Sequence, residues 1–210
     1  MNKPINKVLV LAPHTDDAEF GCGGTIAKFI EAGAEVTVVA FSTCQESLPK
    51  HLAPDTLAIE SKASAECMKV KELILLDYKV RYFSENRQDI LETLVKLKKQ
   101  IQPELVLMPN SNDIHQDHYT IYIEAKRAFK TCKMLGYELP WNNFTMITNY
   151  HEVLTEAHIN KKTEAILCYK SQSHRDYYSS DFVKSLAYVR GTQIGQHYAE
   201  AFELIRWIND

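Results

Sequence analysis

The sequence predicts an α/β protein built on an open, mostly parallel β-sheet with helices on both faces. Two observations lead to this fold class. Short apolar runs alternate along the chain with longer segments of helical periodicity, which is the pattern of successive β-α-β units. In addition, the first 41 residues contain one complete unit of strand, loop, helix and strand, whose right-handed crossover makes the two strands parallel. The predicted architecture is therefore a three-layer, Rossmann-like sheet.

The composition is ordinary for a globular protein and limits the classes of function. With 210 residues, 45% of them hydrophobic and 24% charged, residues 1–210 are expected to form one domain. A net charge of −3 favours neither nucleic acid nor an anionic membrane as partner. No apolar run approaches the ~20 residues that a membrane-spanning helix needs. Five scattered cysteines without a C-x-x-C pair, and a start that leaves no room for a signal peptide, indicate a cytoplasmic protein.

The N-terminal half supplies most of the expected sheet. Lys7–Ala12 is a short, continuous apolar run typical of a buried strand, and Glu35–Phe41 is a second strand rich in β-branched residues. Between them, Thr25 can cap a helix that ends at Gly33. The elements expected next are a polar substrate lip or solvated connector over 42–54, a helix over 57–70, a strand over 73–76, a helix over 86–100 and a strand over 105–108.

The C-terminal half is less regular. A helix is expected over about 119–132, and a loop over 136–143, containing Gly136, Pro140 and Trp141, follows it. Phe144–Thr148 has the composition of a fifth strand. The last elements expected are helices near 161–169 and 181–190, a turn marked by Gly191 and Gly195, and a segment over 199–207 that fits either a helix or an edge strand.

Two polar clusters follow buried strands of this predicted sheet. His14, Asp16 and Asp17 come directly after the first strand, and a His-x-Asp-His cluster at 115–118 follows the strand over 105–108. Because the carboxyl ends of parallel strands share one edge of a sheet, we expect the two clusters to meet. Together they offer three histidines and three acids, enough for a metal site and an acid–base pair.

Other interpretations of these residues are less favoured. Each cluster alone fits a turn or a helix cap, but their placement at corresponding strand ends favours a shared site. The pattern Gly21-x-Gly23 lacks the third glycine of a dinucleotide site, because Ile26 stands there. His115-x-Asp117 with a distant histidine also matches the facial triad of non-haem iron oxygenases, but those enzymes are generally all-β. Cys22 fits a small packing residue better than a nucleophile.

The sequence resembles the PIG-L/LmbE-like family of metal-dependent N-acetyl-sugar deacetylases. The family signature of Pro-His-Pro-Asp-Asp followed by a glycine cluster stands here as Pro13-His-Thr-Asp-Asp17 with Gly21-Cys-Gly-Gly-Thr25, and its later His-x-Asp-His motif stands at 115–118. Thr15 replaces the usual proline of this signature. The family often has an arginine on the helix expected here over 57–70. This chain has no such arginine, because Leu57 stands at that position. The likeness continues through Lys162 to Gln172 and covers essentially the whole chain.

The resemblance implies an LmbE-like fold and a set of roles. It makes His14, Asp17 and His118 the metal ligands, for Zn²⁺ or another divalent metal such as Fe²⁺. It makes Asp16 the general base, His115 the acid that protonates the leaving amine, and Asp117 a residue that orients a histidine. The implied reaction is hydrolysis of the acetamide of an N-acetylglucosamine-type sugar or glycoconjugate, releasing acetate. The implied partner is a small molecule, and assembly into a homo-oligomer is possible. The alternative is a sugar-binding protein that keeps the metal pocket without turnover.

Overall fold

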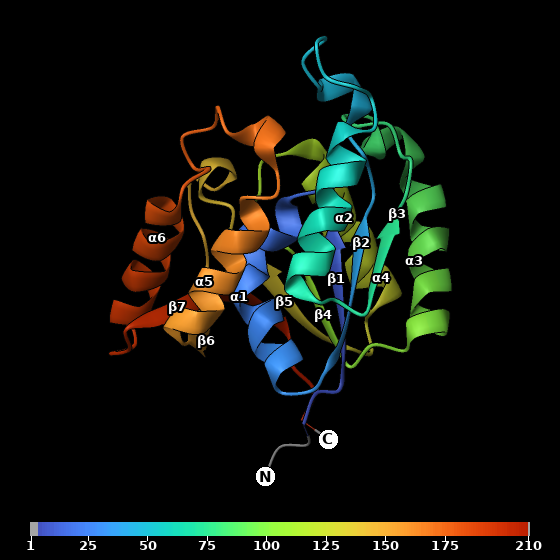
Figure 1. The fold of residues 1–210 in the computed structure, drawn as a ribbon. Helices are drawn as coiled ribbons and strands as arrows, with labels where there is room; N and C mark the ends of the chain where they lie inside the picture. Colours follow the sequence, from blue (N-terminus) through green and yellow to red (C-terminus); the bar gives the residue numbers. More distant parts are fainter. Residues whose placement is uncertain (1–3, 210) are drawn as a thin grey trace.

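The computed structural model describes residues 4–209, and within them the chain forms a seven-stranded sheet in the order β3-β2-β1-β4-β5-β7-β6 (Figure 1). The strands are β1 (Lys7–Ala12), β2 (Glu35–Ala40), β3 (Glu72–Leu75), β4 (Leu105–Pro109), β5 (Lys133–Tyr137), β6 (Tyr150–Leu154) and β7 (Tyr198–Arg206). Strands β1 to β5 are parallel, whereas β7 runs antiparallel to both β5 and β6. The mostly parallel sheet predicted from the sequence is confirmed.

Helices cover both faces of the sheet and complete the three layers (Figure 1). They are α1 (Asp17–Glu31), α2 (Thr56–Met68), α3 (Arg87–Ile101), α4 (Gln116–Ala128), α5 (Glu156–Ile166) and α6 (Ser180–Thr192). Helices α1, α2, α5 and α6 contribute to one buried apolar cluster, while α3 and α4 contribute to a second on the opposite face. This division follows from strand geometry, because successive side chains point to opposite faces.

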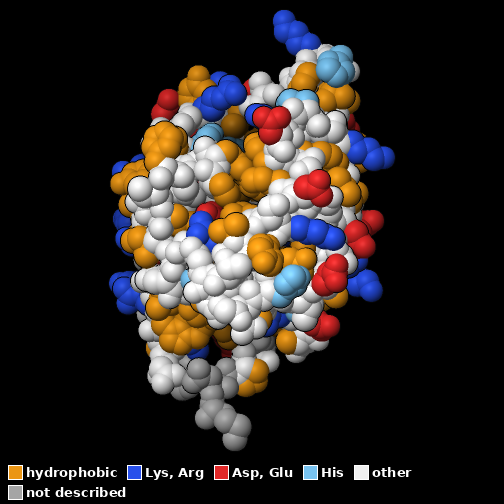
Figure 2. Space-filling view, turned by 90° about the vertical axis from the view of Figure 1, so that its left-hand side faces the viewer, with side chains coloured by type: hydrophobic (Ala, Val, Ile, Leu, Met, Phe, Trp, Pro, Cys, Tyr) orange, Lys and Arg blue, Asp and Glu red, His pale blue; other side chains and the backbone are white. Residues whose placement is uncertain are grey.

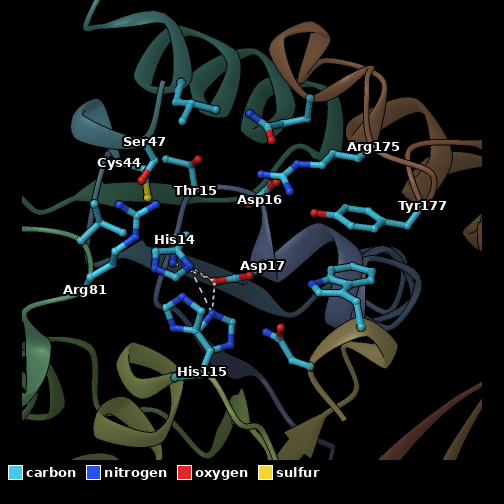
Figure 3. Close-up of a pocket in the computed structure, with 16 residues that line it drawn as sticks. His14, Thr15, Asp16, Asp17, Cys44, Ser47, Arg81, His115, Arg175 and Tyr177 are labelled. Atoms are coloured by element: carbon cyan, nitrogen blue, oxygen red, sulfur yellow. Dashed lines mark hydrogen bonds and ion pairs between the residues drawn. The ribbon is translucent and has the colours of Figure 1, made fainter. Parts of the chain in front are cut away.

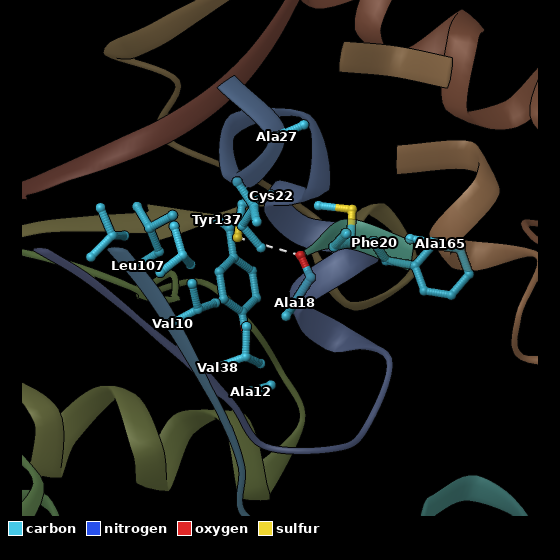
Figure 4. Close-up of a cluster of buried hydrophobic side chains, with 14 of the residues drawn as sticks. Val10, Ala12, Ala18, Phe20, Cys22, Ala27, Val38, Leu107, Tyr137 and Ala165 are labelled. Carbon is cyan, nitrogen blue, oxygen red and sulfur yellow. Dashed lines mark hydrogen bonds between the residues drawn. The ribbon is translucent and has the colours of Figure 1, made fainter. Parts of the chain in front are cut away.

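The alternating side chains of β1 connect the two apolar layers. Val8, Val10 and Ala12 belong to the cluster under α1, and Leu9 and Leu11 belong to the cluster under α3 and α4. Figure 4 shows part of the first cluster, with Val10 and its neighbours packed around a buried tyrosine ring. All five of these side chains are fully buried, so the strand is fixed from both sides. Any loop that leaves its carboxyl end therefore starts from a rigid point.

Adjacent strands bring the two polar clusters together. Strand β1 pairs in parallel with β4, with Val8 opposite Leu105 and Val10 opposite Leu107. The residues that follow the two strands therefore emerge side by side at one edge of the sheet. This is the convergence that the sequence predicted.

Helix α1 differs from the prediction, because it begins at Asp17 and not after Thr25. The glycines expected to form a loop lie inside the helix, where Gly21 allows close approach: a Cβ there would lie 2.4 Å from the ring of Tyr137. The helix is broken at Cys22, whose φ of −149° and ψ of 25° are not helical. Its first segment therefore leads directly from Asp17 into the core.

The C-terminal strands also differ from the prediction. The strand expected at Phe144–Thr148 is wrong, because this segment is irregular and Phe144 is 86% exposed. A strand lies instead on each side of it, β5 and β6. Gly136, expected in a loop, belongs to β5, where a Cβ would lie 2.8 Å from the Cα of Asn110. The segment over 199–207 proves to be strand β7, which lies between β5 and β6 and is not at an edge.

Neither a membrane-spanning helix nor a surface of one charge stands out in the part of the chain that the structure describes and Figure 2 displays. Among the described residues, no helix combines the length and the apolar character that crossing a membrane requires. On the side that carries α6, basic and acidic side chains are interspersed with hydrophobic ones (Figure 2). This mixture agrees with the small net charge of −3.

Candidate active site

A cavity of about 320 Å³ opens at the edge of the sheet where β1 and β4 end. Five of the six predicted site residues line it, namely His14, Asp16, Asp17, His115 and His118 (Figure 3). The sixth, Asp117, is fully buried behind them. The structure therefore brings together two motifs that lie about a hundred residues apart in the sequence.

Three side-chain atoms form a compact triangle at the floor of this cavity. His118 Nε2 lies 3.1 Å from His14 Nδ1 and 3.2 Å from Asp17 Oδ2, and His14 Nδ1 lies 3.3 Å from Asp17 Oδ2. Metal–ligand bonds of about 2.0–2.2 Å in a tetrahedral arrangement place neighbouring ligand atoms roughly 3.2–3.5 Å apart. The triangle therefore fits three ligands of one divalent ion, with two nitrogens and one carboxylate oxygen.

Each histidine of the triangle is held by an acid on its other ring nitrogen. His14 Nε2 lies 3.1 Å from Asp117 Oδ2, and His118 Nδ1 lies 2.7 Å from Asp113 Oδ2. When those nitrogens donate to the carboxylates, His14 Nδ1 and His118 Nε2 keep their lone pairs toward the centre. This is the arrangement that a metal-binding histidine needs.

Asp117 is itself fixed by the loop after β3. It accepts hydrogen bonds from the backbone nitrogens of Arg81, at 2.6 Å, and Phe83, at 3.3 Å. These bonds satisfy a carboxylate that is buried and could not otherwise stay charged. Although burial acts in the opposite direction, the His14 contact and the Arg81 backbone bond lower the pKa of Asp117. The loop after β3 thus contributes to the orientation of His14.

The charges within the triangle favour a bound cation. Burial alone raises the pKa of Asp17, but the neighbouring His118 and His14 outweigh it and hold that pKa well below its usual range. Burial lowers the pKa of His118, but Asp17 and Asp113 raise it to about 10. Ionised acids thus hold protons on the histidines. A divalent ion can replace those protons, because metal binding and protonation compete for the same lone pairs.

Asp16 lies beside the triangle and is half-buried in the cavity wall. Burial and the negative charge of Asp17 raise its pKa to about 6, against the opposing influence of His14 and Arg175. Within residues 4–209 its carboxylate accepts from its own backbone N–H and makes no side-chain hydrogen bond or ion pair with another residue. A carboxylate that titrates near neutral pH and has a free face is suited to accept a proton.

His115 faces the same cavity but is bound differently from the other two histidines. Its Nδ1 accepts a hydrogen bond of 3.2 Å from the backbone N–H of Asp117, which caps α4. In the neutral ring the proton therefore stands on Nε2, which is then a donor and has no lone pair for a metal. Burial and the nearby His118 and His14 lower the pKa of His115 to about 4. Although His14, His115 and His118 lie close enough to form a metal-binding group, the cap favours Asp17 as the third ligand.

Thr15 is held by a bond that the sequence did not reveal. Its carbonyl oxygen accepts a hydrogen bond of 2.5 Å from the hydroxyl of Tyr169, and both residues are buried. The same hydroxyl lies 3.0 Å from Glu19 Oε1, which also accepts from Ser64 at 2.5 Å. This network fixes the backbone between His14 and the acids. It restrains the backbone at the position where the family signature has proline.

Sequence reasoning also missed Asp113 and an aromatic wall. Asp113 stands two residues before His115, and its place in the same polar cluster was the signal that could have identified it.

The rings of Trp141 and Tyr177 stack at 3.7 Å with an angle of 11° between their planes, and both line the cavity. Phe20 packs edge-on against both rings. No motif connects these three positions, which meet only in the folded chain.

Comparisons with known proteins place this geometry in context. A family model described as PIG-L: GlcNAc-PI de-N-acetylase matches residues 9–129, more than half of the chain. The chain is 26% identical to diacetylchitobiose deacetylase from Thermococcus kodakarensis, over 98% of its own length and 86% of that protein.

Solved structures share the fold over nearly the whole chain. A conserved protein from Thermus thermophilus has a TM-score of 0.81 at 21% identity, covering 97% of this chain and 98% of that one. N,N'-diacetylchitobiose deacetylase from Pyrococcus horikoshii, in complex with an inhibitor, has a TM-score of 0.71 at 26% identity, covering 95% of this chain and 83% of that one. The LmbE-like fold implied by the sequence is therefore present.

Proposed function

Since the chain belongs to the PIG-L family, described as GlcNAc-PI de-N-acetylase, we propose that it hydrolyses the acetamide of an N-acetylated amino sugar or sugar conjugate. The observation that carries this proposal is the triangle of His14, Asp17 and His118 with Asp16 beside it. It offers a divalent metal three ligands and places a titratable carboxylate next to them. Zn²⁺ suits this nitrogen and carboxylate set best, and Fe²⁺ is the alternative.

The metal ligands and the base have separate roles in the first half of the reaction. When bound, the metal supplies a Lewis acid that lowers the pKa of water and polarises the acetamide carbonyl. Asp16 accepts the proton of the attacking water, and its pKa of about 6 leaves it ionised for this at neutral pH. Asp117 and Asp113 keep His14 and His118 in the required tautomers throughout. Water attack on the carbonyl carbon then gives a tetrahedral carbon bearing a negative oxygen.

His115 and Asp16 complete the reaction. His115 lines the cavity with its Nδ1 taken by the Asp117 N–H, and its Nε2–H donates a hydrogen bond to the developing oxyanion. Its lowered pKa favours this role over that of the resting proton donor, which the family resemblance implied. The protonated Asp16 returns its proton to the leaving nitrogen as the C–N bond breaks. The products are acetate and the free amino sugar, and Asp16 is ionised again.

The aromatic wall supports a sugar as the substrate. The stacked rings of Trp141 and Tyr177 line the cavity, and Phe20 packs edge-on against both. The C–H face of a sugar ring packs well on such a surface, as apolar groups do on aromatic rings. His14, Asp16 and Asp17, where the acetamide has to react, line the same cavity. One substrate can therefore contact both.

The test combines metal analysis with acetate release. The purified protein is expected to contain about one divalent metal per chain, as one three-ligand site allows. A chelated sample should lose acetate release from N-acetylglucosamine conjugates and regain it when Zn²⁺ or Fe²⁺ is added back. Binding of the same conjugates with metal present and no acetate formed would instead identify a sugar-binding protein. No metal and no acetate release would contradict the proposal.

A further inference from the structure

We propose that Asn110 and Asn143 are positioning residues, whose paired side-chain amides hold Trp141 at a fixed place beside the catalytic cluster and so determine the affinity for the sugar ring. This inference rests on the proposed function and deepens it, because it concerns the binding of the sugar and not the chemistry of the acetamide. Both amides lie outside the lining of the cavity, so they act through other residues.

Two loops meet at this pair of amides. The catalytic loop, residues 110–115, follows β4, and the wall loop, residues 138–143, follows β5 and carries Trp141. Because β4 and β5 are parallel neighbours, both loops leave from the same edge of the sheet. One backbone bond connects them, in which the N–H of Ile114 donates to the carbonyl oxygen of Asn142 at 3.1 Å. The place of Trp141 relative to the catalytic residues therefore depends on how the two loops are joined.

Asn110 joins the two loops through a fully paired amide. The residue is only 1% exposed, and its Nδ2 donates to the backbone oxygen of Tyr137 at 2.8 Å and to Asn143 Oδ1 at 3.0 Å. Its Oδ1 accepts from the backbone N–H of Asn112 at 2.8 Å and from Asn143 Nδ2 at 3.1 Å. These four bonds use the two donors and two acceptor sites of the amide. A buried amide paired in this way fixes its partners relative to one another.

Asn143 closes the wall loop at its base. Its Oδ1 also accepts a hydrogen bond of 3.1 Å from the backbone N–H of Leu139, so the loop is tied across its two ends with Trp141 between them. The chain that follows adds little packing, since Phe144 is 86% exposed. The Asn143 amide is therefore the anchor of this end of the wall loop.

A fixed wall loop favours sugar binding without changing the chemical step. The ring of Trp141 stacks on Tyr177, which belongs to another loop, and a stack that is formed beforehand saves the cost of ordering it when the sugar binds. The sugar ring keeps its contacts while the acetamide reacts, so the benefit is equal in the ground state and the transition state. Interactions of this kind change KM and leave kcat as it is.

Asn143→Ala tests the inference with two substrates, the methyl glycoside of N-acetylglucosamine and the acyclic amide N-acetylethanolamine. The variant removes three hydrogen bonds and is expected to raise KM for the glycoside about tenfold or more, with kcat and metal content nearly unchanged. The kcat/KM for N-acetylethanolamine, which has no sugar ring, should stay at the wild-type value. Equal losses for both substrates, or a lower kcat with an unchanged KM, would overturn the inference.

Further variants separate the amide pair from a general loss of hydrogen bonds. The side chain of Asn149 accepts from the backbone N–H of Leu204 at 2.7 Å outside the cavity, and Asn149→Ala should leave KM unchanged. Asn110→Ala should raise KM as Asn143→Ala does and also lower kcat, because Asn112 in the catalytic loop loses its acceptor. In the double variant, KM should rise far less than the product of the two single effects, since the pair can be lost only once. A rise equal to that product would contradict the pairing.

A spectroscopic measurement distinguishes failure of this inference from failure of the proposed function. The chain has two tryptophans, so in a Trp207→Phe background the fluorescence comes from Trp141 alone. Adding Asn143→Ala should make that fluorescence more easily quenched by acrylamide, and calorimetry on the metal-loaded protein should show weaker binding of the glycoside.

If no substrate releases acetate, the proposed deacetylation fails and these two measurements decide the inference. More quenching together with weaker binding would support it without any turnover. Unchanged quenching, an unchanged dissociation constant, or no binding of the glycoside by the wild type would reject it.

Discussion

A buried ion pair between Lys162 on α5 and Glu200 on β7 holds both sides of the break in helix α1. Lys162 Nζ donates to the backbone oxygen of Phe20, at the end of the first segment, and to Glu200 Oε1, each at 2.7 Å. Glu200 in turn accepts from the backbone nitrogens of Gly24, at 2.9 Å, and Thr25, at 2.7 Å, at the start of the second segment. These are the backbone groups that a broken helix leaves without partners. The ion pair therefore stabilises helix α1 in its broken form, whose first segment runs from Asp17 into the core.

Replacing Lys162 by Met is expected to lower the free energy of unfolding by about 3–5 kcal/mol, because it leaves the Glu200 carboxylate buried without its counter-charge. The two side chains are only 6% and 7% exposed, so water cannot take the place of the ammonium. Helix α1 offers a matched control in Lys28, which pairs with Glu152 at 2.5 Å but is 38% exposed. Lys28→Met should cost no more than about 1 kcal/mol, as usual for exposed pairs.

Urea unfolding followed by circular dichroism measures these differences. The double variant Lys162→Met/Glu200→Gln also removes the negative charge of Glu200. It should be more stable than Lys162→Met by roughly 1 kcal/mol or more. Independent sites do not show such a coupling. A Lys162→Met protein no less stable than Lys28→Met would refute this reasoning. Additive effects in the double variant would refute it as well, since the energy would then not come from the pair.

Further predictions concern the reaction. Asp16→Asn should retain its metal and lose about 10²–10⁴-fold in kcat, the usual scale for a general base, and an active variant would remove Asp16 from that role. Because Asp16 accepts a proton only when ionised, kcat/KM of the wild type should fall as the pH drops below about 6; a profile flat to pH 4.5 would contradict the raised pKa. His115→Gln keeps an N–H donor and should lose roughly 10–100-fold in kcat, less than His115→Ala, while equal losses would exclude hydrogen-bond donation. Tyr169→Phe removes the bond to Thr15 and should lower kcat roughly tenfold with little change in KM, and a change in KM alone would argue against a role in placing the base.

The site could be predicted from the sequence where a local rule determines it. His14 and His118 follow the ends of β1 and β4, and neighbouring parallel strands bring their ends to one edge whatever the rest of the chain does. The apolar runs of these strands are recognisable because both of their faces are buried. Two short motifs and one rule of sheet geometry therefore suffice to predict that the clusters meet.

The remainder depends on contacts between distant segments. The start of α1 at Asp17 and its break could not be seen locally, because Lys162 and Glu200, far along the chain, satisfy the broken backbone. Strand β5 was missed because Gly136, ordinarily a turn residue, is needed there for close packing on Asn110. The stacked pair Trp141 and Tyr177 likewise belongs to two loops without a shared motif. Such features require the three-dimensional structure.

The most direct test of the account is the metal content of ligand variants measured beside their activity. Wild-type protein and the His118→Ala, Asp17→Ala and His115→Ala variants are loaded with Zn²⁺, passed through a desalting column and analysed for bound metal. The triangle predicts about one metal per chain in the wild type and in His115→Ala, and loss of the metal in His118→Ala and Asp17→Ala. Full metal content in Asp17→Ala together with loss in His115→Ala would show that the third ligand is His115, and the proposed mechanism would be wrong.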